Sequence, residues 1–171
     1  MKFRVEREVL AEALGAAARV ASTRNNAMPA LSGVRIEVTG DKLLLSCTDN
    51  DLSVQFVLNV GGQEDGVVVA SAKLMSDIVR SMSEGKVTVE TAGETVSVSS
   101  GRAQFTVPTF AATDFPNIVQ ASAPPVTLAA NFFADALRQV VRAASSDMQR
   151  LALTGVLMSA EPDGLRLVAT D

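Results

Sequence analysis

The sequence contains no histidine, tryptophan or tyrosine, and it has a single cysteine among its 171 residues. Histidine is the commonest general base and the commonest metal ligand, so Ser-His-Asp and Cys-His catalytic sites are excluded and a zinc site is not expected. A lone cysteine excludes a disulfide within the chain, which fits the reducing cytosol. Catalysis would have to rest on carboxylates, Lys, Ser or Thr, and the composition therefore favours a binding or structural protein.

Long apolar runs are missing as well. No stretch of about 18 apolar residues is present, so no membrane span is predicted. The N-terminal residues include Glu6, Glu8 and Glu12 and lack the apolar core of a secretory signal. We therefore expect a cytoplasmic protein that does not associate with a membrane.

The length and the net charge of the chain limit the classes of protein that remain. A chain of 171 residues suggests one domain, or one and a fraction, and 47% hydrophobic residues are enough for a packed core. Fifteen basic residues stand against 19 acidic ones, which gives a net charge of -4. This excludes a simple basic arm for nucleic acid, but it allows a basic face on an acidic body.

The hydrophobic pattern predicts helices at residues 7–21 and 71–82, and a third helix along the apolar stripe of 132–144. Alternation and turn residues predict strands at 34–38, 43–47, 54–60, 67–70, 87–90, 95–99, 103–107, 156–159 and 165–169. Residues 61–66 are predicted to form a hairpin loop, because they are rich in glycine and lack the lysine of a phosphate-binding loop. Helices mixed with hairpins indicate an α+β fold.

Residues 108–125 differ in composition and hydrophobic pattern from the rest of the chain. They hold four of the six prolines and almost no periodic pattern. This composition predicts a linker between two domains.

The pattern after this linker repeats the start of the chain. At an offset of 122, Leu31-x-Gly33-Val34 matches Leu153-x-Gly155-Val156, and Asp41-x-Leu43-x-Leu45 matches Asp163-x-Leu165-x-Leu167. At an offset of 123, Ala13-Leu14 and Arg19 match Ala136-Leu137 and Arg142. We interpret this as an internal repeat of about 122 residues; the alternative is two unrelated amphipathic helices, each followed by a hairpin.

The second copy ends at Asp171 after its first helix and first hairpin. Such a partial domain leaves an apolar helix face and a sheet edge uncovered. We therefore expect the natural chain to continue past Asp171, so that this sequence is a fragment.

Short motifs throughout the chain resemble one protein family. They are Met1-Lys2-Phe3-Arg4-Val5-Glu6-Arg7-Glu8, Pro29-Ala30-Leu31-Ser32-Gly33, Thr48-Asp49, Ser100-Gly101-Arg102 with Phe105, Asp114-Phe115-Pro116-Asn117 and Ala169-Thr170-Asp171. Together they resemble the bacterial sliding clamp, the beta subunit of DNA polymerase III. The resemblance implies a repeated α+β clamp domain with antiparallel sheets outside and helices on the inner face. The first domain would be 1–118, the linker 108–125, and the truncated start of the second domain 126–171.

The resemblance also implies a function. Two chains of the family, with three domains each, close into a homodimeric ring around double-stranded DNA and act as a processivity factor in DNA replication. The implied partners are the DNA polymerase III alpha subunit, the clamp loader and other proteins with a clamp-binding motif. The clamp is a non-catalytic subunit, it needs no cofactor or metal, and it works in the cytoplasm at the nucleoid.

Two alternatives to the clamp stay open. One is a protein-interaction scaffold that is built from the same repeat and never touches DNA. The other is an enzyme that uses Cys47 or the pair Asp49 and Asp51, although the missing histidine argues against it. Cys47 lies in an apolar strand pattern that is more typical of a core residue.

A sliding ring should contact phosphates and avoid base readout, so basic residues on a helix face are the candidate DNA contacts. Residues 13–35 hold Arg19, Arg24 and Arg35 and no acid. Lys73 and Arg80 are seven residues apart and share a helix face, and Arg138 and Arg142 are four apart on the third helix. Arg19 and Arg142 are equivalent in the repeat. The alternative for each of these basic residues is that it lies on an ordinary solvent-exposed helix face and does not contact DNA.

Further positions come from the resemblance alone. Arg24 and Arg150 match DNA-contacting basic positions. Leu151 and Ala152 stand where the family often has aromatic residues, and Asp147 would repel phosphate. Arg102, Phe105 and Val107 match the edge strand of the subunit interface, although Phe105 and Val107 also suit an ordinary hairpin core. Leu153 and Thr170 match two positions of the partner-peptide pocket, and Leu153 is equally compatible with a core position.

Overall fold

The computed structural model describes residues 1–21, 28–118 and 127–171. The chain divides into two compact units, Met1–Gln120 (unit 1) and Ala121–Asp171 (unit 2). We describe each unit by itself.

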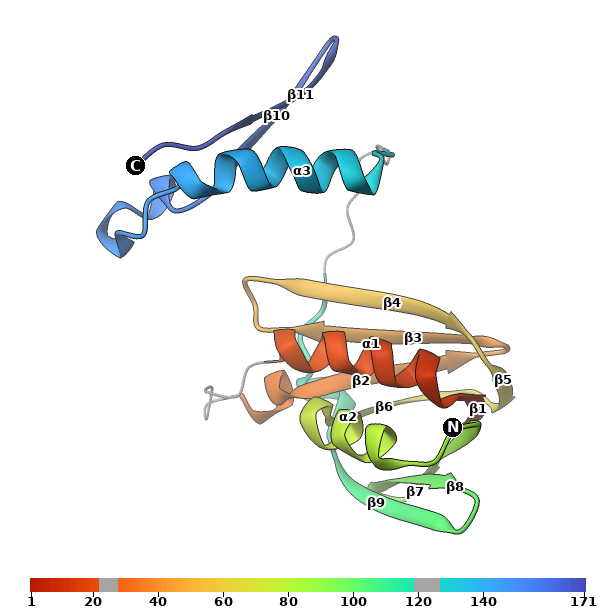
Figure 1. The fold of residues 1–171 in the computed structure, drawn as a ribbon. Helices are drawn as coiled ribbons and strands as arrows, with labels where there is room; N and C mark the ends of the chain where they lie inside the picture. Colours follow the sequence, from red (N-terminus) through yellow and green to blue (C-terminus); the bar gives the residue numbers. More distant parts are fainter. Residues whose placement is uncertain (22–27, 119–126) are drawn as a thin grey trace. The chain divides into compact units, whose positions relative to one another are not determined.

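Unit 1 is a nine-stranded antiparallel sheet with the strand order β4-β3-β2-β6-β9-β8-β7-β1-β5 (Figure 1). Two helices, α1 (Arg7–Val20) and α2 (Ala72–Ser81), interrupt the strands. The strands are β1 (Lys2–Glu6), β2 (Gly33–Thr39), β3 (Lys42–Thr48), β4 (Ser53–Asn59), β5 (Gly61–Glu64), β6 (Gly66–Ser71), β7 (Lys86–Ala92), β8 (Thr95–Ser100) and β9 (Ala103–Phe110).

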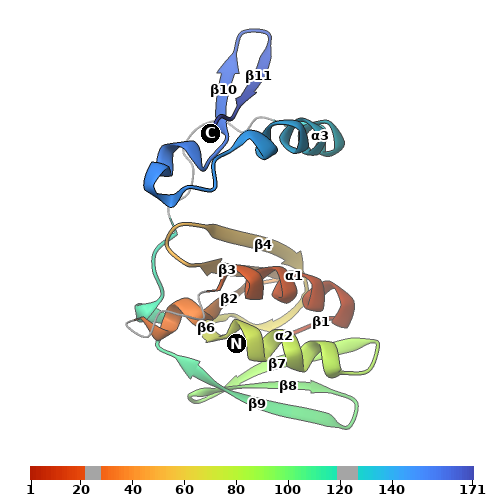
Figure 2. The same cartoon turned by 60° about the vertical axis from the view of Figure 1, so that its left-hand side comes forward.

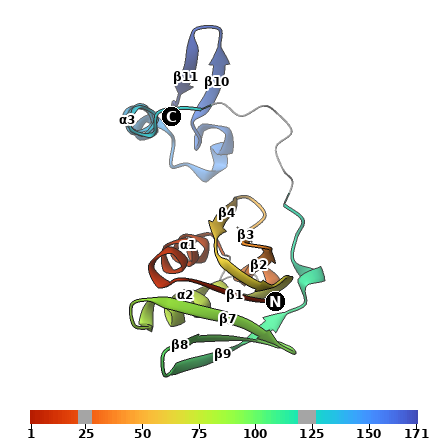
Figure 3. The ribbon, with the colours of Figure 1, turned by 90° about the vertical axis from the view of Figure 1, so that its right-hand side faces the viewer.

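The order of elements divides unit 1 into two similar halves. Strand, helix and three strands follow one another in β1-α1-β2-β3-β4 and again in β6-α2-β7-β8-β9. The first strand of each half pairs with a strand of the other half: β1 pairs with β7, and β6 pairs with β2. The two helices consequently lie side by side on the same face of the strands (Figures 2 and 3).

The core lies between these helices and the sheet. On β2, Val34, Ile36 and Val38 are buried, while Arg35 and Glu37 between them are only half-buried. Leu10 and Leu14 of α1 fall at helical spacing and are also fully buried. The strand period of two and the helix period of 3.6 thus aim apolar side chains at one shared layer.

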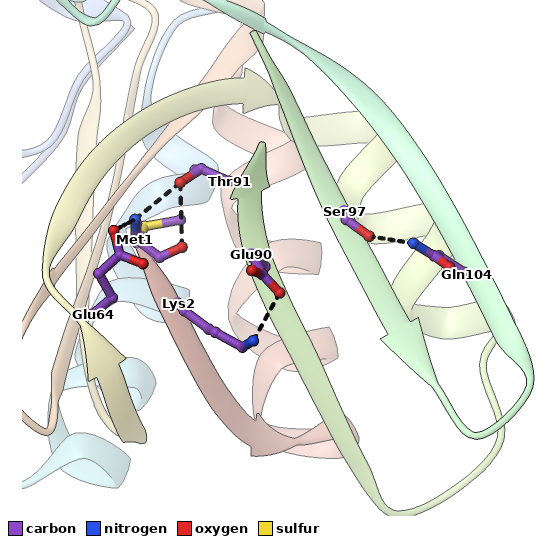
Figure 4. A network of polar contacts seen from close by, with 7 residues as sticks. All are labelled: Met1, Lys2, Glu64, Glu90, Thr91, Ser97 and Gln104. Atoms are coloured by element: carbon purple, nitrogen blue, oxygen red, sulfur yellow. Dashed lines mark hydrogen bonds and ion pairs between the residues drawn. The ribbon is translucent and has the colours of Figure 1, made fainter. Parts of the chain in front are cut away.

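Polar contacts fix β1 between β5 and β7 (Figure 4). The Met1 ammonium nitrogen lies 2.9 Å from the Thr91 hydroxyl oxygen and 3.3 Å from a Glu64 carboxylate oxygen. Lys2 Nζ lies 2.9 Å from the Glu90 carboxylate, across the β1–β7 pair. These contacts tie residues that are far apart in sequence.

Unit 2 contains α3 (Ala130–Val140) and one antiparallel hairpin, β10 (Leu157–Glu161) and β11 (Gly164–Val168). Its register is that of the β2–β3 hairpin shifted by 122 residues: Val38 pairs with Leu43, and Ala160 pairs with Leu165. Likewise Ile36 pairs with Leu45, and Met158 pairs with Leu167. This common register confirms the internal repeat.

The predicted helices and hairpins are confirmed, except that the third helix ends at Val140 and not at residue 144. Three further differences concern the strands. Residues 61–66 are not a hairpin loop, because Gly61–Glu64 form β5 and pair with β1. Strand β1 was missed, and β9 runs into the predicted linker because Thr109 and Phe110 pair with β6. In each case a pairing partner that is distant in sequence decides the structure. Among the described residues, no helix is long and apolar enough to cross a membrane.

Candidate nucleic-acid interface

The solvent side of the α1–α2 helix pair carries a cluster of basic side chains. The buried stripe of α1 turns Arg19 outward, and the buried Met75 and Val79 of α2 turn Lys73 and Arg80 outward. We call Arg19, Lys73 and Arg80 the basic cluster. Lys73 and Arg80 do share a helix face, as their spacing predicts.

The basic cluster surrounds a shallow hollow of about 300 Å³ between the two helices. The hollow is lined by Gly15, Ala18, Arg19, Lys73, Ser76, Asp77 and Arg80. Three cations from two helices therefore face one surface depression, and Asp77 is the acid beside them.

Within the described part of the chain, no side chain of the basic cluster takes part in an ion pair or a hydrogen bond. Like charges that share a surface repel one another, and a cation without an acidic partner keeps its donors free for an external anion. The arrangement suits phosphate oxygens of a nucleic-acid backbone, which accept such bonds without reporting base sequence.

Two other arginines of the predicted basic surface do not join this cluster. Arg24 lies outside the described residues, so its predicted role is untested. Arg35 was expected on the same surface, and this was wrong. It alternates with the buried Val34 and Ile36, faces away from the helices and forms an ion pair with Glu37.

In unit 2 the predicted DNA contacts are exposed but partly neutralised. Arg138 forms an ion pair with Asp135 on α3. Arg142 lies just beyond the end of α3, in a 3-10 turn at Val141–Ala143, so the α-helical spacing behind the expected pairing of Arg138 and Arg142 does not continue to Arg142, and their common face stays a prediction. The 3-10 turn is wound more tightly than an α-helix and rotates Arg142 away from that register.

Arg150 and Asp147 interact with each other in unit 2. Arg150 Nε lies 3.7 Å from an Asp147 carboxylate oxygen. The same aspartate accepts a hydrogen bond of 2.9 Å from the Gln149 backbone N–H. The expected repulsion of phosphate by Asp147 is thus balanced locally by Arg150.

The predicted interface strand β9 has one partly free edge. Ala103–Pro108 pair with β8 on one side, and only Thr109 and Phe110 of β9 pair with β6 on the other. The Phe105 side chain is 41% exposed, whereas Val107 is 1% exposed and belongs to the core. The Val107 side chain therefore cannot contact a partner subunit, and the core alternative holds for this residue; Arg102 is exposed in the turn before β9.

Leu153 and Thr170 are half-buried and exposed, respectively. Neither lines the apolar groove of about 330 Å³ in unit 2. That groove, which the sequence analysis missed, is lined by Thr127, Leu128, Ala129, Phe132, Phe133, Ala136, Leu165 and Leu167. The apolar spacing of 132–136 together with the repeat gave the only sequence clue to it.

The residues of the enzyme alternative have structural roles. Cys47 is fully buried, and its Sγ–H donates a hydrogen bond of 3.1 Å to the Gly33 carbonyl oxygen. Burial raises the pKa of this thiol to about 11, so it stays protonated and a poor nucleophile at neutral pH. The Asp49 carboxylate accepts hydrogen bonds from the backbone N–H groups of Asp51 and Leu52 and so closes a turn.

Comparison with known proteins identifies the family of the chain. The family described as the DNA polymerase III beta subunit, N-terminal domain, matches residues 1–119. The beta sliding clamp of Streptomyces coelicolor is 35% identical over 171 residues, covering 100% of this chain and 45% of that protein. The beta sliding clamp of Escherichia coli K12 is 32% identical over 183 aligned positions, covering 100% and 47%.

A solved structure shares the fold. The DNA polymerase III subunit beta of Pseudomonas aeruginosa superposes with a TM-score of 0.92 at 27% identity, over 100% of this chain and 47% of that one. The chain spans about half the length of the curated relatives it matches. With its family match over residues 1–119, the chain belongs to the DNA polymerase III beta subunit family.

Proposed function

We propose that this chain is part of a sliding clamp that encircles double-stranded DNA and tethers the replicative polymerase to it. The family match supports the class of protein. The observation that carries the DNA assignment is the basic cluster, which presents three cations, unpaired within the described residues, on the solvent face of the α1–α2 pair of an acidic protein.

The charge pattern suits a protein that holds DNA and still slides. Cations on an exposed helix face attract phosphates at any sequence position. Asp77 beside the cluster and the net charge of -4 keep this attraction small. A weak contact that reads no bases leaves topology, not affinity, to hold the ring on DNA.

The proposed role is non-catalytic and depends on partners. Ring closure would use the free edge of β9, with Phe105 and Arg102 exposed beside it. The partners would be a second copy of the full-length chain, the polymerase III alpha subunit, the clamp loader and other proteins with a clamp-binding motif. Such a protein would work in the cytoplasm at the nucleoid.

The deciding experiment uses the full-length natural polypeptide, loaded by its ATP-driven loader onto nicked circular DNA and onto the same DNA linearised. We expect retention on circles and loss from linear ends, because a ring slides off an open end. Equal retention on both would show surface binding and contradict encirclement. Failure to bind either DNA would favour the scaffold alternative.

Charge reversal in the basic cluster tests whether this helix surface binds DNA. Arg19→Glu, Lys73→Glu and Arg80→Glu together should weaken DNA binding and flatten its salt dependence by roughly 0.9 per lost phosphate contact. Lys42→Glu is the matched control for each of the three reversals made singly, because Lys42 is exposed and alternates with the buried Leu43 and Leu45, on the sheet face away from the helices. If Lys42→Glu has the same effect, the attraction is general and the helix face is not the DNA surface.

A further inference from the structure

Gly15 is an unexpected residue in the middle of α1. It is buried, and Ala13, Ala16, Ala17 and Ala18 surround it in the sequence. Glycine is a poorer helix former than alanine, and its backbone here does not adopt a positive φ. Neither helix propensity nor backbone geometry therefore explains glycine at this position.

The side chain of Arg80 fills the space that glycine leaves open. A Cβ atom built on Gly15 would lie 2.2 Å from Arg80 Nη2 and 3.3 Å from Arg80 Cζ. Its three nearest heavy atoms all belong to the Arg80 side chain. The guanidinium of α2 thus lies directly against the backbone of α1, and any side chain at residue 15 would displace it.

This contact holds Arg80 without consuming its donors. Within the described residues, the Arg80 guanidinium has no ion pair or hydrogen bond, and it lies in the space that Gly15 leaves on α1. The same hollow is lined by Arg19 of α1 and Lys73 of α2. A cation that is already ordered loses less conformational entropy when it binds a ligand.

We propose that Gly15 is a positioning residue that seats the Arg80 guanidinium against α1 and so joins it to Arg19 in one subsite for a backbone phosphate of duplex DNA. This inference rests on the proposed function, because it takes the basic cluster as a DNA surface. Gly15 itself touches no phosphate and acts only through Arg80.

The test is Gly15→Ala in the 171-residue chain, titrated with a short mixed-sequence DNA duplex at low salt and followed by NMR. Alanine forces the guanidinium outward until ordinary contact distances, from 3.4 Å, are restored. We expect DNA affinity to fall by roughly threefold to tenfold, in line with a weakened charge-assisted hydrogen bond. The Arg80 Nε–H signal should shift even without DNA, which a purely structural role of Gly15 would not cause.

A double-mutant cycle separates positioning from general damage. Arg80→Ala should weaken binding at least as much as Gly15→Ala, and Gly15→Ala should add nothing in the Arg80→Ala background. If Gly15→Ala lowers stability, Arg80→Ala should restore it by removing the clash. Gly155→Ala is the matched control, because a Cβ there meets no atom within 4 Å.

The outcomes distinguish the two proposals. If Arg80→Ala weakens binding but Gly15→Ala does not, the positioning role is overturned and the DNA surface stands. An additive effect of Gly15→Ala in the Arg80→Ala background also overturns positioning. If neither Arg80→Ala nor reversal of the basic cluster changes binding, the proposed DNA surface fails and this inference fails with it.

Discussion

At the scale of single residues, burial determines which side chains of unit 1 have chemistry available. Cys47 is the only thiol of the chain, and its fully buried Sγ–H is committed to the Gly33 carbonyl oxygen. Arg19, Lys73 and Arg80 are exposed and uncommitted within the described residues. The three cations are therefore available for electrostatic contacts, whereas the Cys47 thiol is not available as a nucleophile.

Cys47 gives a prediction about pH. Burial raises the pKa of its thiol from 9.0 to about 11, so the unfolded thiol ionises at a lower pH than the native one. The resulting stability is fully present below pH 9 and is lost as pH rises from 9 to 11, by about 2 to 3 kcal/mol. Urea unfolding of the wild type and of Cys47→Ala at pH 8 and 10.5 checks this. Parallel losses of stability in both proteins would show that lysines, not Cys47, control this range.

At the scale of elements, strand β9 contributes one side chain to the core and exposes another to solvent. Phe105 and Val107 point to the same side of the strand, since they are two residues apart. Only Val107 lies deep enough to be covered by the helix layer, and Phe105 remains 41% exposed. A strand whose edge is free over part of its length and that carries an exposed aromatic residue is suited to pairing with another chain.

The two side chains of β9 should respond differently to a charge. Val107→Asp buries an unpaired carboxylate, and we expect it to unfold unit 1 or to cost several kcal/mol. Phe105→Asp should change the free energy of unfolding by less than about 1 kcal/mol, while it abolishes self-association of the full-length protein. Urea unfolding and sedimentation velocity check the pair. A severe loss of stability with Phe105→Asp would place Phe105 in the core and remove it from the proposed interface.

The stability of helix α2 depends on the cap of its first turn. The Ser71 side chain caps α2 by accepting a hydrogen bond of 3.4 Å from the Leu74 backbone N–H. Ser71→Ala should cost about 0.5 to 2 kcal/mol of stability, while Ser71→Asp should retain the cap. Thermal unfolding compares the two variants. Equal loss in both would mean that the side-chain cap is not what Ser71 contributes to stability.

At the scale of the whole molecule, the two units differ in how completely their apolar surfaces are covered. Unit 1 has a buried core between its two helices and its nine-stranded sheet. In residues 127–171, by contrast, no residue is fully buried, and Phe132 is 80% exposed. One helix and one hairpin are too few elements to enclose a core.

Amide hydrogen exchange should therefore proceed at different rates in the two units. We expect amides of α3, β10 and β11 to exchange much faster than those of β2, β3 and β6, because few apolar contacts oppose their opening. Binding of an apolar dye should fall in Phe132→Ser while exchange in unit 1 stays unchanged. Equal protection of both units in exchange mass spectrometry would contradict this division.

The sequence predicted local elements well because helix and strand periods are properties of neighbouring residues. The stripe in α1 and the alternation in β2 and β3 appear directly in the chain. It could not predict β5, where Gly61 and Gly62 form a strand only because β1 supplies partners from the other end of the unit. Of the candidate site, the shared face of Lys73 and Arg80 followed from their spacing. Arg35 lies on the opposite face of the sheet, because β2 alternates and its neighbours Val34 and Ile36 are the buried residues.

By itself, the sequence determined the α+β class, the repeat and the absence of histidine chemistry, because composition and periodicity do not depend on distant contacts. Only the tertiary structure decided which cations share a surface. Arg19 and Arg80 are 61 positions apart, and they line one hollow because α1 and α2 pack together and Gly15 leaves room for a guanidinium. Packing of this kind depends on atoms brought together across the fold, and no local pattern in the chain records it.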